Sequence, residues 1–395
     1  MKIGDVSYLH EIGILCLILI ATTTISHFFT RFKIPAVVGQ LLIGILLGPA
    51  LIGWIQPSEF ISLFSEIGVI ILMFTAGLES NLSLLKKYFK PSLMVAILGV
   101  VFPVAAIYLF SLLFHIGQSE SIFIGVIFAA TSVSISVAVL KELNGLTGKV
   151  GATILGAAVV DDVLAVVILS VMTSLGSNQA GTGLLLKSVE QIAYFIAIYF
   201  IVKFCAPFIA KLGLKLFVPM SETIVALILC FGMAYIADLV GLSSVVGAFF
   251  AGIAISQTRV KNLVKQSIES IGEAIFIPVF FVSIGLSISF NGLVGQIGFI
   301  LILTILAILT KLLGAGMGAK LSGYTLPESY IVGAGMVSRG EMALIIAQIG
   351  FESKLIGSTY YASIITVIIL TTIVAPFLLK HAFSIQKRSI NPTQK

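Results

Sequence analysis

Charged residues are scarce in this chain. Asp, Glu, Lys and Arg make up 10% of its 395 residues, whereas a soluble globular domain carries about 25%. Hydrophobic residues make up 58%, and they form continuous runs rather than the alternating pattern of a transmembrane β-strand. The composition therefore excludes a soluble domain and predicts an all-α polytopic membrane protein.

Cysteine and histidine are also few. The three cysteines, Cys16, Cys205 and Cys230, lie in apolar stretches at no metal-ligand spacing, so we expect them to fill space in the core. The four histidines fall near the ends of apolar runs and indicate no metal site. We expect no cofactor and no catalytic centre, and hence a protein that is not an enzyme.

Runs of about 20 apolar residues predict thirteen membrane spans, although two very short loops leave twelve or fourteen open. The predicted limits are 8–28, 34–53, 60–78, 92–114, 119–140, 150–174, 188–210, 221–240, 242–257, 271–289, 295–319, 328–349 and 357–380. With the N-terminus outside, 17 of the 23 Lys and Arg residues fall in inner loops or the C-terminal tail, and only 3 in outer segments. This positive-inside pattern predicts a cytoplasmic C-terminus. It also explains the net charge of +6 without nucleic acid as a partner.

The chain contains an internal repeat. Residues 37–48 (VVGQLLIGILLG) resemble residues 245–256 (VVGAFFAGIAIS) at an offset of 208, and the same offset aligns MFTAGLE (73–79) with FVSIGLS (281–287). This offset corresponds to seven spans, and an odd number means that the second copy enters the membrane from the opposite side. The sequence therefore predicts an inverted-topology repeat, an architecture that places substrate at the membrane midplane where broken helices cross.

Two spans have the composition of such broken helices. The fifth contains Thr131 and Ser132 within the hydroxyl-rich FAATSVSISVAVL (128–140), although clustered hydroxyls can also bond back to their own helix. The twelfth contains Arg339, Gly340 and Glu341 in GAGMVSRGEMALI (333–345). Glycine lets the backbone unwind, and the two charges can neutralise the half-helix dipoles. We expect Arg339 and Glu341 to stabilise the crossing rather than to bind substrate.

The strongest functional signal is a pair of adjacent aspartates, Asp161 and Asp162, in the middle of the sixth span. One carboxylate at mid-bilayer costs about 2.5–3.5 kcal/mol on insertion scales, so two indicate an ion or proton site. Lys311 is the expected partner, since it lies too deep in its span for easy snorkelling. Consecutive helical residues point about 100° apart, so one aspartate can pair with Lys311 while the other faces a water-filled cavity.

The sequence resembles the monovalent cation:proton antiporter-2 family, and within it the short bacterial sodium(potassium)/proton antiporters, including those of spore germination. The most specific elements are ATSVSISVAVLKEL (130–143), VVDD (159–162), PVFFVSIGL (278–286) and MVSRGEMAL (336–344). The resemblance implies that Asp162 is the main cation-binding carboxylate, that Asp161 pairs with Lys311, and that Thr131 and Ser132 sit at the first helix break.

The resemblance also implies a homodimer in the bacterial inner membrane and a division of each chain into functional parts. A dimerisation domain comprises 1–90 and 216–290, an ion-transporting core comprises 91–175 and 291–382, residues 176–215 link them, and 383–395 form a cytoplasmic tail. A carboxylate that holds either a proton or Na⁺, K⁺ or Li⁺ would couple the two fluxes. An organic-anion transporter of the same inverted-repeat fold is the alternative, but its cavity should be rich in cationic groups, whereas here the acids outnumber the nearby lysine.

Overall fold

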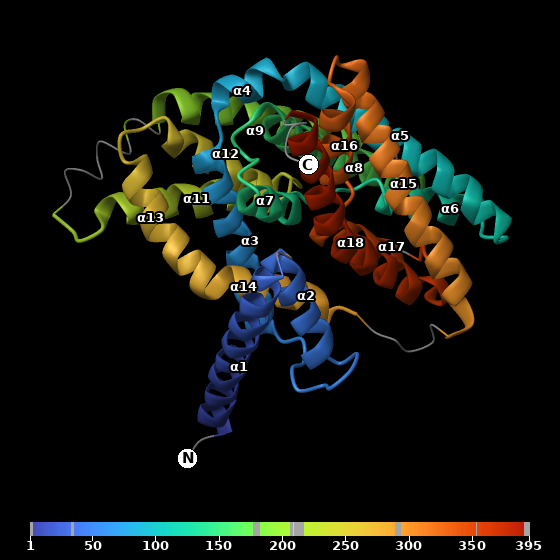
Figure 1. Ribbon diagram of the computed structural model, residues 1–395, viewed down its shortest axis with the longest axis horizontal. Helices are drawn as coiled ribbons and strands as arrows, with labels where there is room; N and C mark the ends of the chain where they lie inside the picture. Colours follow the sequence, from blue (N-terminus) through green and yellow to red (C-terminus); the bar gives the residue numbers. More distant parts are fainter. Residues whose placement is uncertain are drawn as a thin grey trace.

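The computed structural model describes residues 3–32, 35–176, 182–205, 208, 217–288, 294–352 and 354–390. The regular structure of these residues is helical throughout (Figure 1). Among the residues that the structure describes, seven helical stretches are long and apolar enough to cross a membrane, namely Leu9–Arg31, Glu59–Glu79, Phe89–Leu113, Ser221–Leu239, Lys261–Leu286, Ile297–Leu321 and Tyr360–Gln386. Four shorter helices of the described chain are also apolar, namely Ala36–Leu47, Ile192–Cys205, Ser244–Ser256 and Met342–Phe351. The expected all-α polytopic fold is confirmed.

Thirteen segments of the described chain correspond to the thirteen predicted spans. The uninterrupted ones are α1 (Ile3–Arg31), α2 (Ala36–Leu47), α3 (Glu59–Glu79), α5 (Phe89–Leu113), α8 (Lys149–Gly176), α9 (Thr182–Phe200) with the π-turn η1 (Ile201–Cys205), α11 (Ser221–Leu239), α12 (Ser244–Ser256), α13 (Lys261–Ile271) running through η2 (Gly272–Phe276) into α14 (Ile277–Leu286), α15 (Ile297–Leu321) and α18 (Ser358–Ile390). The interrupted ones are α6 (Gln118–Ile127) with α7 (Val133–Glu142), and α16 (Leu326–Gly335) with α17 (Glu341–Glu352). Two short helices, α4 (Leu82–Lys87) and η3 (Val294–Gln296), connect segments.

Helix α2 is shorter than the predicted span 34–53. Its 12 residues extend about 18 Å, less than the ~30 Å of a bilayer core. The helix stops before Gly48 because Pro49 lacks an N–H and disfavours helical backbone at the residue before it. The following turn folds back, so that the N–H of Ile55 donates to the carbonyl of Leu47 at 2.9 Å.

Two pairs of crossing helices reveal the inverted repeat. Gly44 of α2 faces Gly285 of α14, and Gly77 of α3 faces Gly252 of α12; a Cβ at any of the four would overlap the partner backbone. The repeat offset of 208 maps Gly44 onto Gly252 and Gly77 onto Gly285, so it converts one crossing into the other. The two crossings are therefore equivalent under an internal two-fold relation, as the sequence repeat predicts.

The helices of the two glycine crossings and their neighbours form a first group, which comprises α1, α2, α3, α11, α12, α13 with η2, and α14. A second group forms around α5 and α15, which pack along one another and are also related by the offset of 208. Gly314 and Gly318 of α15 lie directly against the backbone of α5. Helices α6, α8, α16, α17 and α18 complete this group. In Figure 1 it occupies the right of the view, while α1, α11, α13 and α14 lie to the left.

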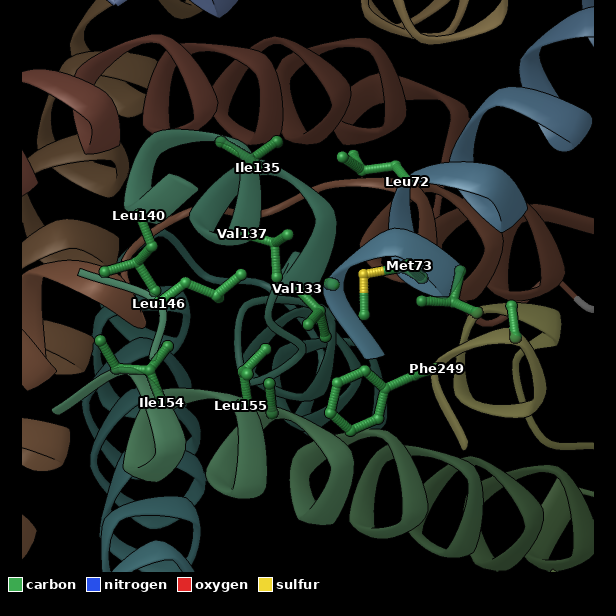
Figure 2. Close-up of a cluster of buried hydrophobic side chains, with 14 of the residues drawn as sticks. Leu72, Met73, Val133, Ile135, Val137, Leu140, Leu146, Ile154, Leu155 and Phe249 are labelled. Atoms are coloured by element: carbon green, nitrogen blue, oxygen red, sulfur yellow. The ribbon is translucent and has the colours of Figure 1, made fainter. Parts of the chain in front are cut away.

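The half-helix α7 lies between the two groups, in contact with α3 and α8. Figure 2 shows Val133 and Val137 of α7 beside Met73 of α3 and Leu155 of α8, with Phe249 of α12 in the same cluster. All five side chains are buried. The interior of this contact is thus apolar and makes few directional bonds.

The C-terminal end of α7 is polar and bonds to the first group. Lys141 forms ion pairs with Glu269 of α13 and Glu273 of η2, the latter at 2.7 Å. The carboxylate of Glu142 accepts a hydrogen bond of 2.9 Å from the backbone N–H of Ala36 at the start of α2. These charged contacts join the two groups at a single end of α7.

Three expectations need correction. Cys16 and Cys205 are exposed and only Cys230 is buried, because an apolar run in a membrane protein can face lipid as readily as core. The span predicted at 271–289 begins earlier, since α13 starts at Lys261. The hydropathy of residues 261–270 is low because Lys265 and Glu269 lie there, although this amphipathic segment belongs to the same continuous helix. The predicted tail 383–395 is helical up to Ile390, and 391–395 lie outside the described residues.

Candidate functional site

The two interrupted helices cross through their unwound loops. The backbone N–H of Ser132 donates to the carbonyl of Ser338 at 2.8 Å, and the hydroxyl of Ser338 donates to the carbonyl of Ser132 at 3.0 Å. Gly340 is required here because a Cβ would collide with the side chain of Ser132. The crossing is therefore a reciprocal hydrogen-bonded contact between two loops that are 206 residues apart in sequence.

Side chains satisfy the backbone carbonyls that the breaks expose. The last carbonyls of a helix have no partner within it. The hydroxyl of Ser136 on α7 donates to the carbonyl of Gly335 at 2.5 Å, which caps the end of α16. The hydroxyl of Thr372 on α18 donates to the carbonyl of Arg339. The breaks are thus built into the packing of three helices.

Arg339 lies in the second break and is fully buried. Its guanidinium donates to the carbonyl of Met336, at the end of α16, and to the carbonyl of Ala307 on α15, both at 3.2 Å. A cation at this position is favourable because the C-terminal end of a helix carries a partial negative charge. Glu341 begins α17, but its side chain is not among those that the structure describes.

The expected partner of the aspartate pair is present at the first break. Lys311 and Asp161 are both fully buried, and Nζ of Lys311 lies 2.6 Å from Oδ2 of Asp161. The same ammonium donates to the carbonyl of Ala129, just beyond α6, at 2.7 Å. Thr131 donates to Oδ2 of Asp161 at 2.6 Å. One oxygen of Asp161 therefore receives two donors, whereas Oδ1 is buried without a hydrogen-bond partner among the described residues.

Asp162 follows directly on α8 and is 2% exposed. Its position one residue after Asp161 turns it away from Lys311 by about 100°. The structure thus brings together Asp161, Lys311 and Thr131 as one bonded cluster. Asp162 is buried beside this cluster, and Ser132 lies at the crossing of the two loops.

Sequence reasoning missed several members of this arrangement. Ser338 and Thr372 were not singled out, although each bonds to a break, and the carbonyls of Ala129 and Ala307 were not expected as partners of the buried cations. Ser338 directly precedes Arg339 in a span with few hydroxyl groups, and this position could have identified Ser338 from the sequence. Backbone carbonyls leave no signal in the sequence.

The chain is similar to known exchangers over nearly its whole length. The family model for the sodium/hydrogen exchanger, transmembrane region, matches residues 17–384. A Na⁺/H⁺ antiporter of Enterococcus hirae is 55% identical over 94% of this chain and 97% of its own length. The Na⁺/H⁺-K⁺ antiporter GerN of Bacillus cereus is 42% identical over 96% of this chain and 98% of its own.

A solved structure shares the fold. The sodium proton antiporter MjNhaP1 from Methanocaldococcus jannaschii aligns over 98% of this chain and 100% of its own, with a TM-score of 0.66 at 19% identity. The thirteen segments, the crossed helix breaks and the family match over residues 17–384 agree with one another. The chain is a membrane protein that belongs to the sodium/hydrogen exchanger family.

Proposed function

We propose that this protein is a secondary active transporter that exchanges Na⁺ for H⁺ across the cytoplasmic membrane, with K⁺ or Li⁺ as alternative cations. The observation that carries the proposal is the pair of buried carboxylates, Asp161 and Asp162, on α8 at a helix break, where Asp161 forms an ion pair with Lys311. Family membership supports it, as do the names of the relatives, which are Na⁺/H⁺ and Na⁺/H⁺-K⁺ antiporters.

Asp162 is the proposed site of competition between cation and proton. A carboxylate oxygen that binds a proton loses the charge that attracts Na⁺, so the two substrates exclude one another. Hydroxyl and backbone oxygens are the hard ligands that complete the shell of such a cation, and the loop containing Thr131 and Ser132 supplies both kinds beside α8. Asp161 is proposed as a second ligand through Oδ1, since its Oδ2 already accepts from Lys311 and Thr131.

The proposed mechanism is elevator-type alternating access. Residues 91–175 and 291–382 would form the moving core, and 1–90 and 216–290 the dimerisation domain, joined by the linker 176–215. The apolar contact of α7 with α3 in Figure 2 supports this division, because such a surface can slide without breaking many hydrogen bonds. In this proposal the protein is a homodimer, with the N-terminus outside and the C-terminus in the cytoplasm, as the lysine and arginine distribution indicates.

The test is transport in liposomes that contain the purified protein and an internal pH dye. Addition of Na⁺, and then of K⁺, to the outside should drive protons across the membrane, and Asp162→Asn should abolish this response. If Asp162→Asn shows a thermal unfolding transition like that of the wild type but transports no protons, the result would support Asp162 as the site. Absence of a response to any monovalent cation in the wild-type protein would overturn the proposal and favour organic-anion transport.

A further inference from the structure

A cavity lies beside α8 at Val159 and Val160, the two residues that precede Asp161 and Asp162 in the chain. It has a volume of about 920 Å³, within the ~300–1,000 Å³ of typical ligand pockets. Its walls come from α4, α8, α9 with η1, and α12, and the labels of α4, α9 and α12 lie close together in Figure 1. We call it the α4–α9–α12 cavity. It separates α12 of the first group from α8, the helix that carries the two aspartates.

The interior of the α4–α9–α12 cavity is apolar. Val159 and Val160 of α8, Phe195 and Ile198 of α9, and Phe250 of α12 line it. These side chains carry no oxygen that could replace the water ligands of Na⁺, so this part of the cavity does not suit a bound ion. A hydrocarbon chain does suit it, because apolar surface is stabilised by removal from water.

The rim of the same cavity is cationic and polar. It contains Lys86 from the end of α4, Lys203 and Tyr199 from α9 and η1, and Gln257 from the end of α12. Lys203 donates to the Tyr199 hydroxyl at 3.1 Å. The ion pairs between described residues involve neither Lys86 nor Lys203. Two lysines therefore face the entrance of an apolar chamber without a carboxylate to neutralise them.

Lys203 is unusual among the cations that the sequence places within spans. The other two, Lys311 and Arg339, are fully buried and donate to backbone carbonyls, and Lys311 also pairs with Asp161, whereas Lys203 is exposed and forms part of the cavity lining. The lysine distribution puts this rim on the cytoplasmic side, where the leaflet is rich in anionic lipid and each nearby Lys or Arg contributes to lipid attraction.

We propose that the α4–α9–α12 cavity binds an anionic glycerophospholipid. The phosphate lies between Lys86 and Lys203, and one acyl chain enters the chamber between α8 and α12. Charge complementarity selects this occupant, since a water-soluble anion would leave the chamber unfilled and a zwitterionic lipid such as phosphatidylcholine would bring its cationic ammonium group toward the two lysines. The regulatory consequence rests on the proposed function. An acyl chain between α8 and α12 must be displaced when the two groups of helices move, so a bound lipid slows exchange.

Lipid binding can be measured by native mass spectrometry of the full-length protein equilibrated with phosphatidylglycerol and phosphatidylcholine. The wild type should retain phosphatidylglycerol in preference to phosphatidylcholine. Lys86→Gln with Lys203→Gln should weaken its binding by about 30-fold, from the loss of two lysines near an anionic surface. Lys87→Gln with Lys90→Gln, which makes the same charge change beside the rim, should bind within about twofold of the wild type.

A second pair of variants tests the chamber. Ile198→Trp fills the cavity and should lower retention of phosphatidylglycerol, whereas Ile196→Trp on the outer face of α9 should not; Ile196 is 54% exposed and Ile198 only 4%. Equal retention by the Lys86/Lys203 variant and the wild type, equal retention of the two lipids, or selective retention of a single-chain fatty acid would each overturn the proposal.

The transport measurement separates this proposal from the function on which its regulatory part rests. In liposomes, phosphatidylglycerol should slow cation-driven proton movement by the wild type, and the Lys86/Lys203 variant should not respond to it. If the wild type binds the lipid but transports nothing in any membrane, the proposed function fails and the lipid site stands. If transport is normal and no lipid preference exists, the lipid site fails and the function stands.

Discussion

The buried pair of Asp161 and Lys311 allows a sharp test of how this site is held together. Removal of one partner from a buried ion pair costs about 3–5 kcal/mol, because it leaves a charge without compensation in a medium of low polarity. Lys311→Met keeps most of the side-chain volume and leaves Asp161 alone with Thr131. Asp161→Asn keeps the shape but removes the negative charge that pairs with Lys311, which still donates to the carbonyl of Ala129. Each single variant should therefore lose about 3–5 kcal/mol in the free energy of unfolding.

The double variant should be far more stable than the sum of the single effects predicts. Replacement of a whole buried pair by neutral groups of similar volume is often without cost. We therefore expect Asp161→Asn with Lys311→Met to lose no more than about 2 kcal/mol, so that the coupling between the sites exceeds ~3 kcal/mol. Reversible unfolding in mixed micelles measures these values. Lys320→Met, an exposed position in the last turn of the same helix, controls for general effects of the substitution.

The pH dependence of the single variants has opposite signs. Protonation of the lone Asp161 in Lys311→Met removes the uncompensated charge, so its loss of stability should shrink as the pH falls. Deprotonation of the lone Lys311 in Asp161→Asn does the same, so its loss should shrink as the pH rises. A double variant that loses the full sum of the single effects, or single variants with the same pH trend, would refute the ion-pair reasoning.

Three further predictions follow from the same contacts. Asp162→Asn should retain a normal thermal unfolding temperature but lose Na⁺-driven proton movement in liposomes; retained exchange would remove it from the proposed site. Gly252→Ala should destabilise the fold strongly because its Cβ would overlap α3, whereas Gly232→Ala meets open space and should not; equal melting temperatures would contradict the close crossing. Lys141→Gln breaks ion pairs between the two groups and should raise the exchange rate about two- to fivefold, if the two partly exposed pairs together hold the resting arrangement by ~0.5–1 kcal/mol. Lys149→Gln breaks a pair within one group and should leave the rate unchanged, so a faster Lys149 variant would argue against movement between the groups.

The helix breaks were predictable because their composition conflicts with a simple membrane span. Arg339 and Gly340 have no reason to occur in mid-span unless the backbone unwinds there, and the observed interruption between Gly335 and Glu341 contains both. The hydroxyls of Thr131 and Ser132 gave a weaker signal, since a hydroxyl can also bond to its own helix. The structure resolves that ambiguity, because neither residue lies in α6 or α7.

Other features depend on information that the local sequence does not contain. Helical geometry required only one of the two aspartates to face Lys311, but periodicity alone cannot identify which one, since that depends on the rotation of α8 against α15. The exposure of Cys16 was unpredictable for a similar reason: hydropathy does not distinguish lipid from protein interior. The cap of Ser136 on Gly335 joins residues 199 apart and arises only when the two broken helices are packed together.

The inverted repeat organises the backbone but not the charges. At the offset of 208 that exchanges the two glycine crossings, Lys311 corresponds to Pro103 and Asp161 to Ile369, so neither member of the ion pair has a charged counterpart. A symmetric frame lets two halves exchange their conformations, which generates two states of similar energy that open to opposite sides. In the proposed mechanism, the asymmetric set of charges gives both states the same single site. This division of labour suits the proposed exchange, in which one carboxylate site presented alternately to each side would make the two substrates compete within every cycle.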